Sequence, residues 1–298
     1  MRPVLTNFWK SAPIAAALAL SAPASAVEFE LTYDGVPEEM RGDLAKAADI
    51  LAPCLVSDVP VRVRVTWIER GPTGYAQQPG FRNRDFLPVA DVWYPSALAN
   101  ALTGRRLVEQ DDMNIFLSAR TDWYLDSDTP IEEGKTDLLG VMMHEIGHGL
   151  GLSTGTFTPY EGEPVSSIGL PNAYENYFDL SFERAEQDGT PTLYDSFLRL
   201  ADGRTLTDFG NPSMELTYAL ANPTMHFTGK QATKANGGYP VAVVPLAVSH
   251  IHGLPRAPEP MMANASGNGE VRRSNDPIAL AMLADLGWTI ADECRSWD

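Results

Sequence analysis

The sequence HEIGHGLGL at positions 144–152 constrains this chain more than any other feature. Residues four apart on an α-helix lie on one face about one turn from each other, so His144 and His148 can reach the same metal ion. Neutral imidazole is a common ligand of Zn²⁺. The carboxylate of Glu145, beside the first histidine, can accept a proton from a zinc-bound water. The spacing therefore predicts a zinc-binding helix that carries its own general base.

The residues on either side set the limits of this helix. Thr136 and Asp137 are both good N-caps, so the helix is expected to begin at one of them. Gly149 and Gly151 favour a turn with positive φ, which stops the helix just after the second histidine. The side expected to be buried consists of Leu138, Leu139, Val141 and Met142.

Residues 1–26 are typical of a secretory signal peptide. They combine a positively charged start, a short apolar run over 14–20 and an A-x-A cleavage site at 24–26. No other stretch approaches the roughly 18 apolar residues that a membrane span needs, so no membrane anchor is expected. The sequence thus predicts an exported protein, secreted or periplasmic, whose mature part is 27–298.

Charge and cysteine content limit the partners and the compartment. The chain of 298 residues has a formal net charge of −17, which argues against nucleic acid and anionic membranes as partners. It contains two cysteines, Cys54 and Cys294. Because an exported chain meets an oxidising compartment, a disulfide between them is expected, with two free thiols as the alternative.

The pattern before the motif predicts an N-terminal lobe, about 27–152, with a mixed sheet and packed helices. Apolar residues recur at helical spacing over 37–53, and strict alternation over 61–65 predicts a half-buried strand. Two further strands are expected over 88–94 and 113–117, with a short helix between them over 96–102.

The rest, about 153–298, is expected to form a loop-rich C-terminal lobe. The part up to residue 249 is rich in Gly, Pro, Asn and Thr and favours short strands, with one helix over 193–200. Near the end, Asp276 is a good N-cap, Pro277 suits the first helical position and Gly287 suits the C-terminus, which predicts a closing helix. The fold class expected is therefore α+β.

A catalytic zinc ion takes three protein ligands and keeps one open position. The chain has five histidines, so His226, His250 and His252 remain as candidates for the third ligand. His250 and His252 are two residues apart and would share one face of a strand, so spacing alone does not choose between them.

The run from His144 resembles the metzincin metallopeptidases, whose extended pattern is H-E-x-x-H-x-x-G-x-x-H. Gly151 falls where the family has its glycine, but Thr154 stands where the compact pattern has its third histidine. The leishmanolysin-like branch and related secreted bacterial proteins instead have a distant third histidine in a Ser-His context, shortly before a Met-turn. Ser249-His250, followed by Met261-Met262, is similar to that arrangement.

The resemblance implies a metzincin-like zincin fold and a set of roles. It implies that His144, His148 and His250 bind one Zn²⁺ and that Glu145 is the general base. It also implies that Met262, or alternatively Met261, is the Met-turn residue beneath the ligands. The chain would then be a secreted zinc endopeptidase that hydrolyses peptide bonds of protein or peptide substrates with a zinc-activated water.

Several alternatives stay open at this point. Glu175, with an aspartate four residues later, could be the third ligand in a thermolysin-like gluzincin scheme, although such motif helices normally continue past the second histidine. The protein could also be a non-catalytic exported binding or adhesion domain on a metzincin scaffold, a reading that the intact Glu145 disfavours. A Ca²⁺ site, which no standard loop spacing supports, would use Asp126, Asp128, Glu132 and Glu133.

Overall fold

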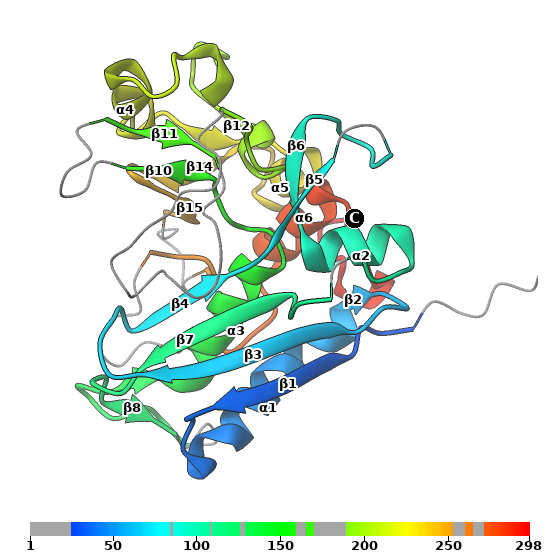
Figure 1. The fold of residues 1–298 in the computed structure, drawn as a ribbon, viewed down its shortest axis with the longest axis vertical. Coiled ribbons are helices and arrows are strands. Elements are labelled where there is room, and N and C mark those ends of the chain that lie inside the picture. The colour runs from blue at the N-terminus through cyan, green and yellow to red at the C-terminus, as the bar shows by residue number, and fades with distance from the viewer. Residues whose placement is uncertain are drawn as a thin grey trace, which may run out of the picture.

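The computed structural model describes residues 25–83, 86–107, 109–125, 129–158, 165–169, 189–252, 260–264 and 271–298. The expected signal peptide falls almost wholly outside the described residues. The architecture is mixed α+β, with small sheets and helices in both halves of the chain (Figure 1). Within the described part, no helix has the length and apolar character needed to cross a membrane.

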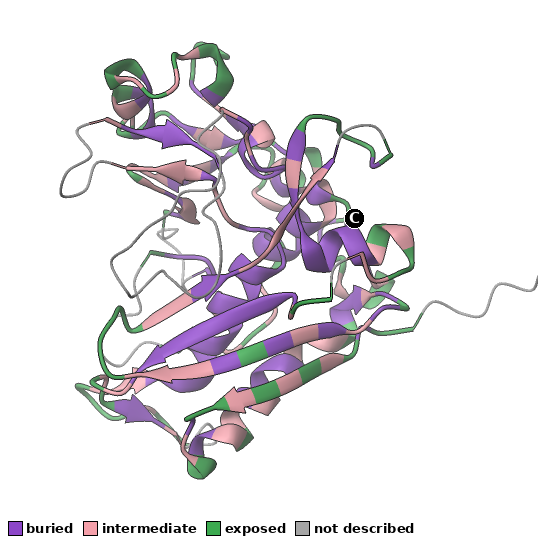
Figure 2. Cartoon of the chain, in the orientation of Figure 1, coloured by how far each residue is buried: buried purple, intermediate pink, exposed green. Residues whose placement is uncertain are grey.

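The N-terminal half is built on a four-stranded sheet in the order β1-β3-β7-β4. β1, β3 and β7 are parallel to one another, whereas β4 runs antiparallel to β7 at the edge. The alternation that predicted β3 places Val63 and Val65 in the core and leaves Arg64 exposed on the opposite face (Figure 2). The strand bounds are β1 Phe29–Asp34, β3 Val61–Ile68, β4 Gly74–Gln77 and β7 Met113–Ser118.

Two helices, α1 and α3, pack against each other and against one face of this sheet (Figure 1). Helix α3, which contains the histidine motif, spans Leu138–Gly149, follows Asp137 directly and contacts both β7 and β4. Its apolar side chains are fully buried, which fixes the motif against the sheet. The helices of this half are α1 Arg41–Leu51, α2 Ser96–Thr103 and α3 Leu138–Gly149.

The C-terminal half contains a second four-stranded sheet, antiparallel throughout, in the order β12-β13-β14-β15. Figure 1 shows it above the N-terminal sheet, beside α4. Its strands are β12 Leu198–Arg199, β13 His226–Phe227, β14 Val241–Val244 and β15 Ala247–Ile251. Its helices are α4 Met214–Leu220, α5 Lys230–Ala235 and α6 Pro277–Leu286.

Short two-stranded pairs complete the fold. They are β2 Leu55–Val56 with β16 Thr289–Ile290, β5 Gly80–Asn83 with β6 Val92–Pro95, β8 Trp123–Tyr124 with β9 Thr136–Asp137, and β10 Thr156–Phe157 with β11 Ser167–Ile168. The 3-10 turns span Glu38–Met40, Ala52–Cys54, Asp195–Phe197, Leu206–Asp208 and Asp292–Cys294.

The C-terminal tail returns to the N-terminal half. The closing helix α6 has the limits that the sequence predicts, because the Asp276 side chain accepts a hydrogen bond from the Ile278 N–H and Gly287 ends the helix with φ 114°. The indole of Trp288 then donates to the Leu150 carbonyl at the end of α3, 2.9 Å away. A disulfide between Cys54 and Cys294, the pairing expected from the sequence, closes the connection.

Two expectations about elements are wrong. The strand expected over 88–94 is only Val92–Pro95, because Asp91 adopts φ 56° and interrupts the extended backbone. The helix expected over 193–200 is a single 3-10 turn followed by β12. There the buried Asp195 carboxylate accepts from the Thr192 N–H at 2.9 Å, and the chain becomes extended at Leu198. Helices α4 and α5 were not expected, and both are short.

The disulfide closes a sequence separation of 240 residues, so it should contribute substantially to stability. Reduction is expected to lower the free energy of unfolding by about 2–5 kcal/mol, because it restores freedom to the unfolded chain. Urea unfolding with and without reductant measures this difference. A Cys54→Ala/Cys294→Ala variant serves as the control, since reductant should leave its stability unchanged. Equal stabilities of the oxidised and reduced protein would contradict the expectation.

Candidate metal centre

The start of the motif helix is fixed by a buried ion pair rather than by a side-chain cap. Both carboxylate oxygens of Asp137 accept from Nε of Arg273 at 2.9 Å, and the Arg273 Nη2 lies 2.8 Å from Oδ1. The Asp137 side chain is 2% exposed, and the Arg273 guanidinium also lies over the Tyr124 ring. Arg273 lies in the segment that leads into the closing helix α6 at Pro277, so this pair connects that segment to the start of α3.

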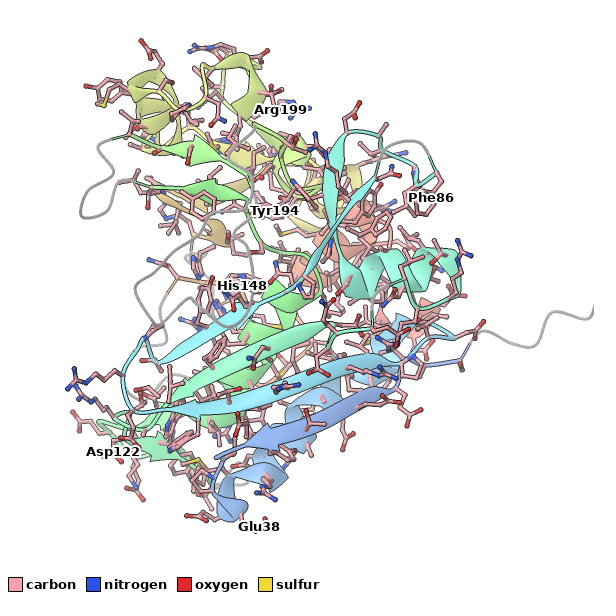
Figure 3. The ribbon with its side chains drawn as sticks, viewed as in Figure 1. Glu38, Phe86, Asp122, His148, Tyr194 and Arg199 are labelled. Atoms are coloured by element: carbon pink, nitrogen blue, oxygen red, sulfur yellow. A yellow bond between two sulfur atoms is a disulfide. The ribbon has the colours of Figure 1, made fainter. Side chains whose placement is uncertain are left out.

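Three imidazoles come together at the other end of α3. His144, His148 and His250 each direct one ring nitrogen to a common region, where these atoms lie within 4.8 Å of one another. The two Nε2 atoms of His144 and His148 are 3.0 Å apart, and the His250 ring stacks on that of His144 with centroids 5.2 Å apart. Figure 3 shows His148 at the junction of the two halves of the molecule. The three side chains could hold one metal ion.

The opposite nitrogen of each ring faces a backbone carbonyl. The Nδ1 atoms of His144 and His148 lie 2.7 Å from the carbonyl oxygens of Met261 and Leu152, and that of His250 lies 3.3 Å from Ala247 O. A carbonyl oxygen can only accept, so these contacts assign the proton to Nδ1 and leave a lone pair on each Nε2. Three lone pairs facing one region are the donor set that a divalent cation such as Zn²⁺ prefers.

The surroundings keep the imidazoles neutral. Burial and, to a lesser degree, the neighbouring His250 lower the pKa of His144 to about 3. Burial likewise brings the pKa of His148 well below its ordinary value and lowers that of His250. A neutral imidazole is the form that binds a metal, so protons compete weakly for this site at neutral pH.

The turn after the motif helix depends on Gly151. Its φ of 127° is a conformation that residues with a Cβ rarely adopt, and a Cβ there would lie 3.0 Å from the Pro95 ring. This reversal brings the Leu152 carbonyl back onto the His148 ring. The sequence-based expectation of a sharp glycine turn after the second histidine is confirmed.

Glu145 lies beside the cluster, between α3 and the edge strand β4. It is 5% exposed, and the Ala76 N–H of β4 donates to its carboxylate. Its Oε2 has no hydrogen-bond partner among the described residues. Burial raises the pKa of Glu145 to about 8, although the Ala76 contact opposes the rise. A divalent cation nearby would also oppose it, because positive charge favours the carboxylate.

Strand β4 approaches Glu145 so closely that it requires a glycine. A Cβ on Gly74 would lie 2.7 Å from Oε1 of Glu145 and 2.8 Å from the Val141 side chain. No sequence pattern indicates this role, since Gly74 follows Pro72 and Thr73 in a segment that resembles an ordinary turn. Only the packing of the helix on the sheet reveals it.

Two methionines pack directly beneath the cluster. Met261 and Met262 are 2% and 0% exposed. A Cβ added to Gly147, which lies between the two motif histidines, would stand 2.6 Å from the Met262 sulfur. The Met262 carbonyl also accepts from the Ile251 N–H of β15, 3.0 Å away. The methionine segment therefore touches both the motif helix and the strand that carries His250.

A cavity of about 350 Å³ opens in front of His144, Glu145 and His250. Edge strand β4 contributes Gly74 to its wall, and the segment after the methionines contributes Asn264. Arg272, 8% exposed, also lines the cavity and donates from Nη1 to the Ala263 carbonyl at 3.1 Å. The space is large enough for several substrate atoms and is lined by both charged and small side chains.

The other sequence candidates do not join this group. His252 is exposed and follows the last residue of β15, while His226 lies on β13 with its Nδ1 2.8 Å from the Thr224 carbonyl. Neither belongs to the histidine cluster of the described residues. Glu175 lies outside the described residues.

The same limit applies to the expected calcium ligands. Asp126 and Asp128 lie outside the described residues, so the geometry of such a site is not defined. Of the remaining two, Glu133 is exposed and Glu132 pairs with Lys135 at 2.9 Å. This contact is typical of a solvated acidic turn.

The comparisons with known proteins match part of the chain. A family model described as SPBPB7E8-like matches residues 92–166, a stretch that contains α3 and the histidine motif but neither His250 nor Met262. No curated protein and no solved structure matches the chain. The geometry of the site therefore carries the functional argument.

The packing of Gly147 predicts a change in stability. Gly147→Ala should lower the free energy of unfolding by about 1–3 kcal/mol, because the buried side chains of Met261 and Met262 must shift to make room for the added Cβ. Gly42→Ala is the matched control in another helix, since nothing lies within 4 Å of its added Cβ. The control should gain up to about 1 kcal/mol from helix propensity. Urea unfolding in the presence of a chelator measures both, and an unchanged Gly147→Ala variant would contradict the packing argument.

Proposed function

We propose that this protein is an exported zinc-dependent endopeptidase with a metzincin-like catalytic domain over 27–298. The observation that carries the proposal is the combination of neutral imidazoles and a buried carboxylate at one cavity. His144, His148 and His250 direct lone pairs to one region, and Oε2 of Glu145 faces no partner among the described residues. A purely structural role explains neither the convergent lone pairs nor this carboxylate oxygen.

The three histidines would hold one Zn²⁺, and Met262 would be the Met-turn residue packed beneath them. Bound zinc would supply a Lewis acid that polarises a substrate carbonyl and lowers the pKa of water. No carboxylate ligand is required, because three imidazoles already provide the three protein ligands of a catalytic zinc site. The distant His250 would replace the third histidine of the compact pattern, at whose position this chain has Thr154.

Glu145 would move the proton. The Ala76 N–H holds the carboxylate in place, and Oε2 is available to accept a proton from a water molecule that attacks the substrate. Burial favours the protonated form of Glu145, so the carboxyl group can keep the proton until the leaving amine accepts it. One residue thereby serves as base and then as acid.

The edge of the sheet supports a peptide as the substrate. Among the described strands only β7 pairs with β4, and Gly74 of β4 lines the cavity beside Glu145. A strand edge that pairs with no further strand can offer backbone groups to an extended chain. A polypeptide laid along β4 would pass the carboxylate and the three imidazoles.

Hydrolysis of casein by the purified protein tests this function. The wild type should cleave casein, lose activity on chelation and recover it with Zn²⁺. Glu145→Gln should keep its zinc but lower kcat by about 10²–10⁴-fold, the usual contribution of a general base. Glu133→Gln, at an exposed position, is the matched control and should remain active. A folded, zinc-loaded wild type without activity would favour a binding domain instead.

Zinc affinity separates the candidates for the third ligand. His250→Ala should weaken Zn²⁺ binding by more than about 100-fold, since changes even in outer-shell partners weaken metal binding by 10–100-fold. His252→Ala is the control two residues away and should bind zinc as the wild type does. Competition with a chromophoric chelator measures both affinities. Weakening by His252→Ala alone would contradict the assignment.

A further inference from the structure

Thr154 has a structural use at the position where the compact metzincin pattern has a histidine. Its backbone N–H donates to Oγ of Ser249, 2.9 Å away. Ser249 directly precedes His250 on β15. Thr154, which stands where the compact pattern has its third ligand, is therefore hydrogen-bonded to Ser249, the residue directly before His250.

Thr154 is itself anchored by a buried carboxylate. Its hydroxyl donates to Oδ1 of Asp195 at 2.5 Å, and Oδ2 accepts the N–H groups of Gly155 and Thr192, each at 2.9 Å. Asp195 is 1% exposed. With both oxygens bonded inside the protein, the carboxylate fixes the chain at Thr154 and hence the direction of its N–H.

Three separate segments of the chain form hydrogen bonds with the residues on either side of His250. The Tyr194 hydroxyl donates to the Val248 carbonyl at 2.7 Å, Thr154 bonds to Ser249, and the Ile251 N–H donates to the Met262 carbonyl at 3.0 Å. Figure 3 shows Tyr194 above His148, on the side of the C-terminal sheet. These contacts lie on both sides of His250 along the strand.

His250 depends on this support more than the other two histidines do. Its own Nδ1 contact, to the Ala247 carbonyl, is 3.3 Å long, whereas those of His144 and His148 are 2.7 Å. His144 and His148 are also fixed to each other by one helix. The imidazole that comes from a distant strand has the weakest orienting bond of its own.

We propose that Ser249, bonded to the Thr154 N–H that Asp195 anchors, positions His250 for metal binding. Ser249 and Thr154 are thus positioning residues that touch neither the metal nor the substrate. Tyr194 is the second anchor of the same strand segment. The inference rests on the proposed metal site, but it concerns how the third imidazole is placed rather than whether peptides are cleaved.

The test measures zinc affinity, together with the visible absorption spectrum of the Co²⁺-loaded protein, which reports the geometry of the ligands. Ser249→Ala should bind Zn²⁺ about tenfold more weakly, at the lower end of outer-shell effects, and should shift the Co²⁺ bands. Ser249→Thr keeps a hydroxyl acceptor and should restore both. Ser118→Ala is the matched control, because Ser118 Oγ also accepts a backbone N–H, that of Arg120 at 3.2 Å.

Tyr194→Phe removes only the bond to Val248 and should weaken zinc binding in the same direction, which keeps the test decisive if Ser249→Ala does not fold. Wild-type affinity in Ser249→Ala, or an equal loss in Ser118→Ala, would overturn the inference. A wild type that binds no zinc contradicts the proposed function and the inference with it. A wild type that binds zinc but does not cleave casein contradicts only the endopeptidase activity, and the affinities still decide the positioning role.

Discussion

The architecture of the site depends on keeping three imidazole lone pairs directed at one region. Two of the Nε2 atoms lie only 3.0 Å apart, an arrangement that is unfavourable unless something positive lies between or beside them. The protein maintains it with backbone carbonyls behind the rings, supplied by Leu152, Ala247 and Met261. These carbonyls come from three segments of the chain, so the cluster needs both halves of the fold in place.

The residues just before the closing helix α6 form contacts that position the methionine segment and the start of α3. Asp276 caps α6 with one carboxylate oxygen and accepts the Met261 N–H with the other, 3.1 Å away. Arg273 holds Asp137 at the start of α3, and Arg272 donates to the Ala263 carbonyl. Buried ion pairs contribute little net stability but specify position well when the geometry is satisfied. Here the Arg273–Asp137 ion pair holds the start of the motif helix, while the hydrogen bonds of Asp276 and Arg272 hold the methionine segment.

Local sequence patterns were enough to predict the elements whose form depends on residues within the same helix, strand or turn. The motif helix, the glycine turn, the closing helix and the alternating strand β3 were all predictable, because spacing of three, four or two residues determines which side faces the core. Gly74, Ala76 and Asp195 were not predictable, since their importance comes from contacts with segments distant in sequence. Spacing alone did not separate His250 from His252; the Ser-His resemblance favoured His250, and the structure distinguishes them because β15 ends at Ile251.

The order in which the chain is synthesised affects when the histidine cluster can form. The motif histidines are synthesised about a hundred residues before His250, and strand β16 and Cys294, which join the tail to the N-terminal half, follow later still. Because the supports of the cluster include Met261, Met262 and Asp276, a chain that stops before them is expected to lack the contacts that orient His144 and the strand of His250. Formation of the histidine cluster is thus expected to require residues that are synthesised well after His250.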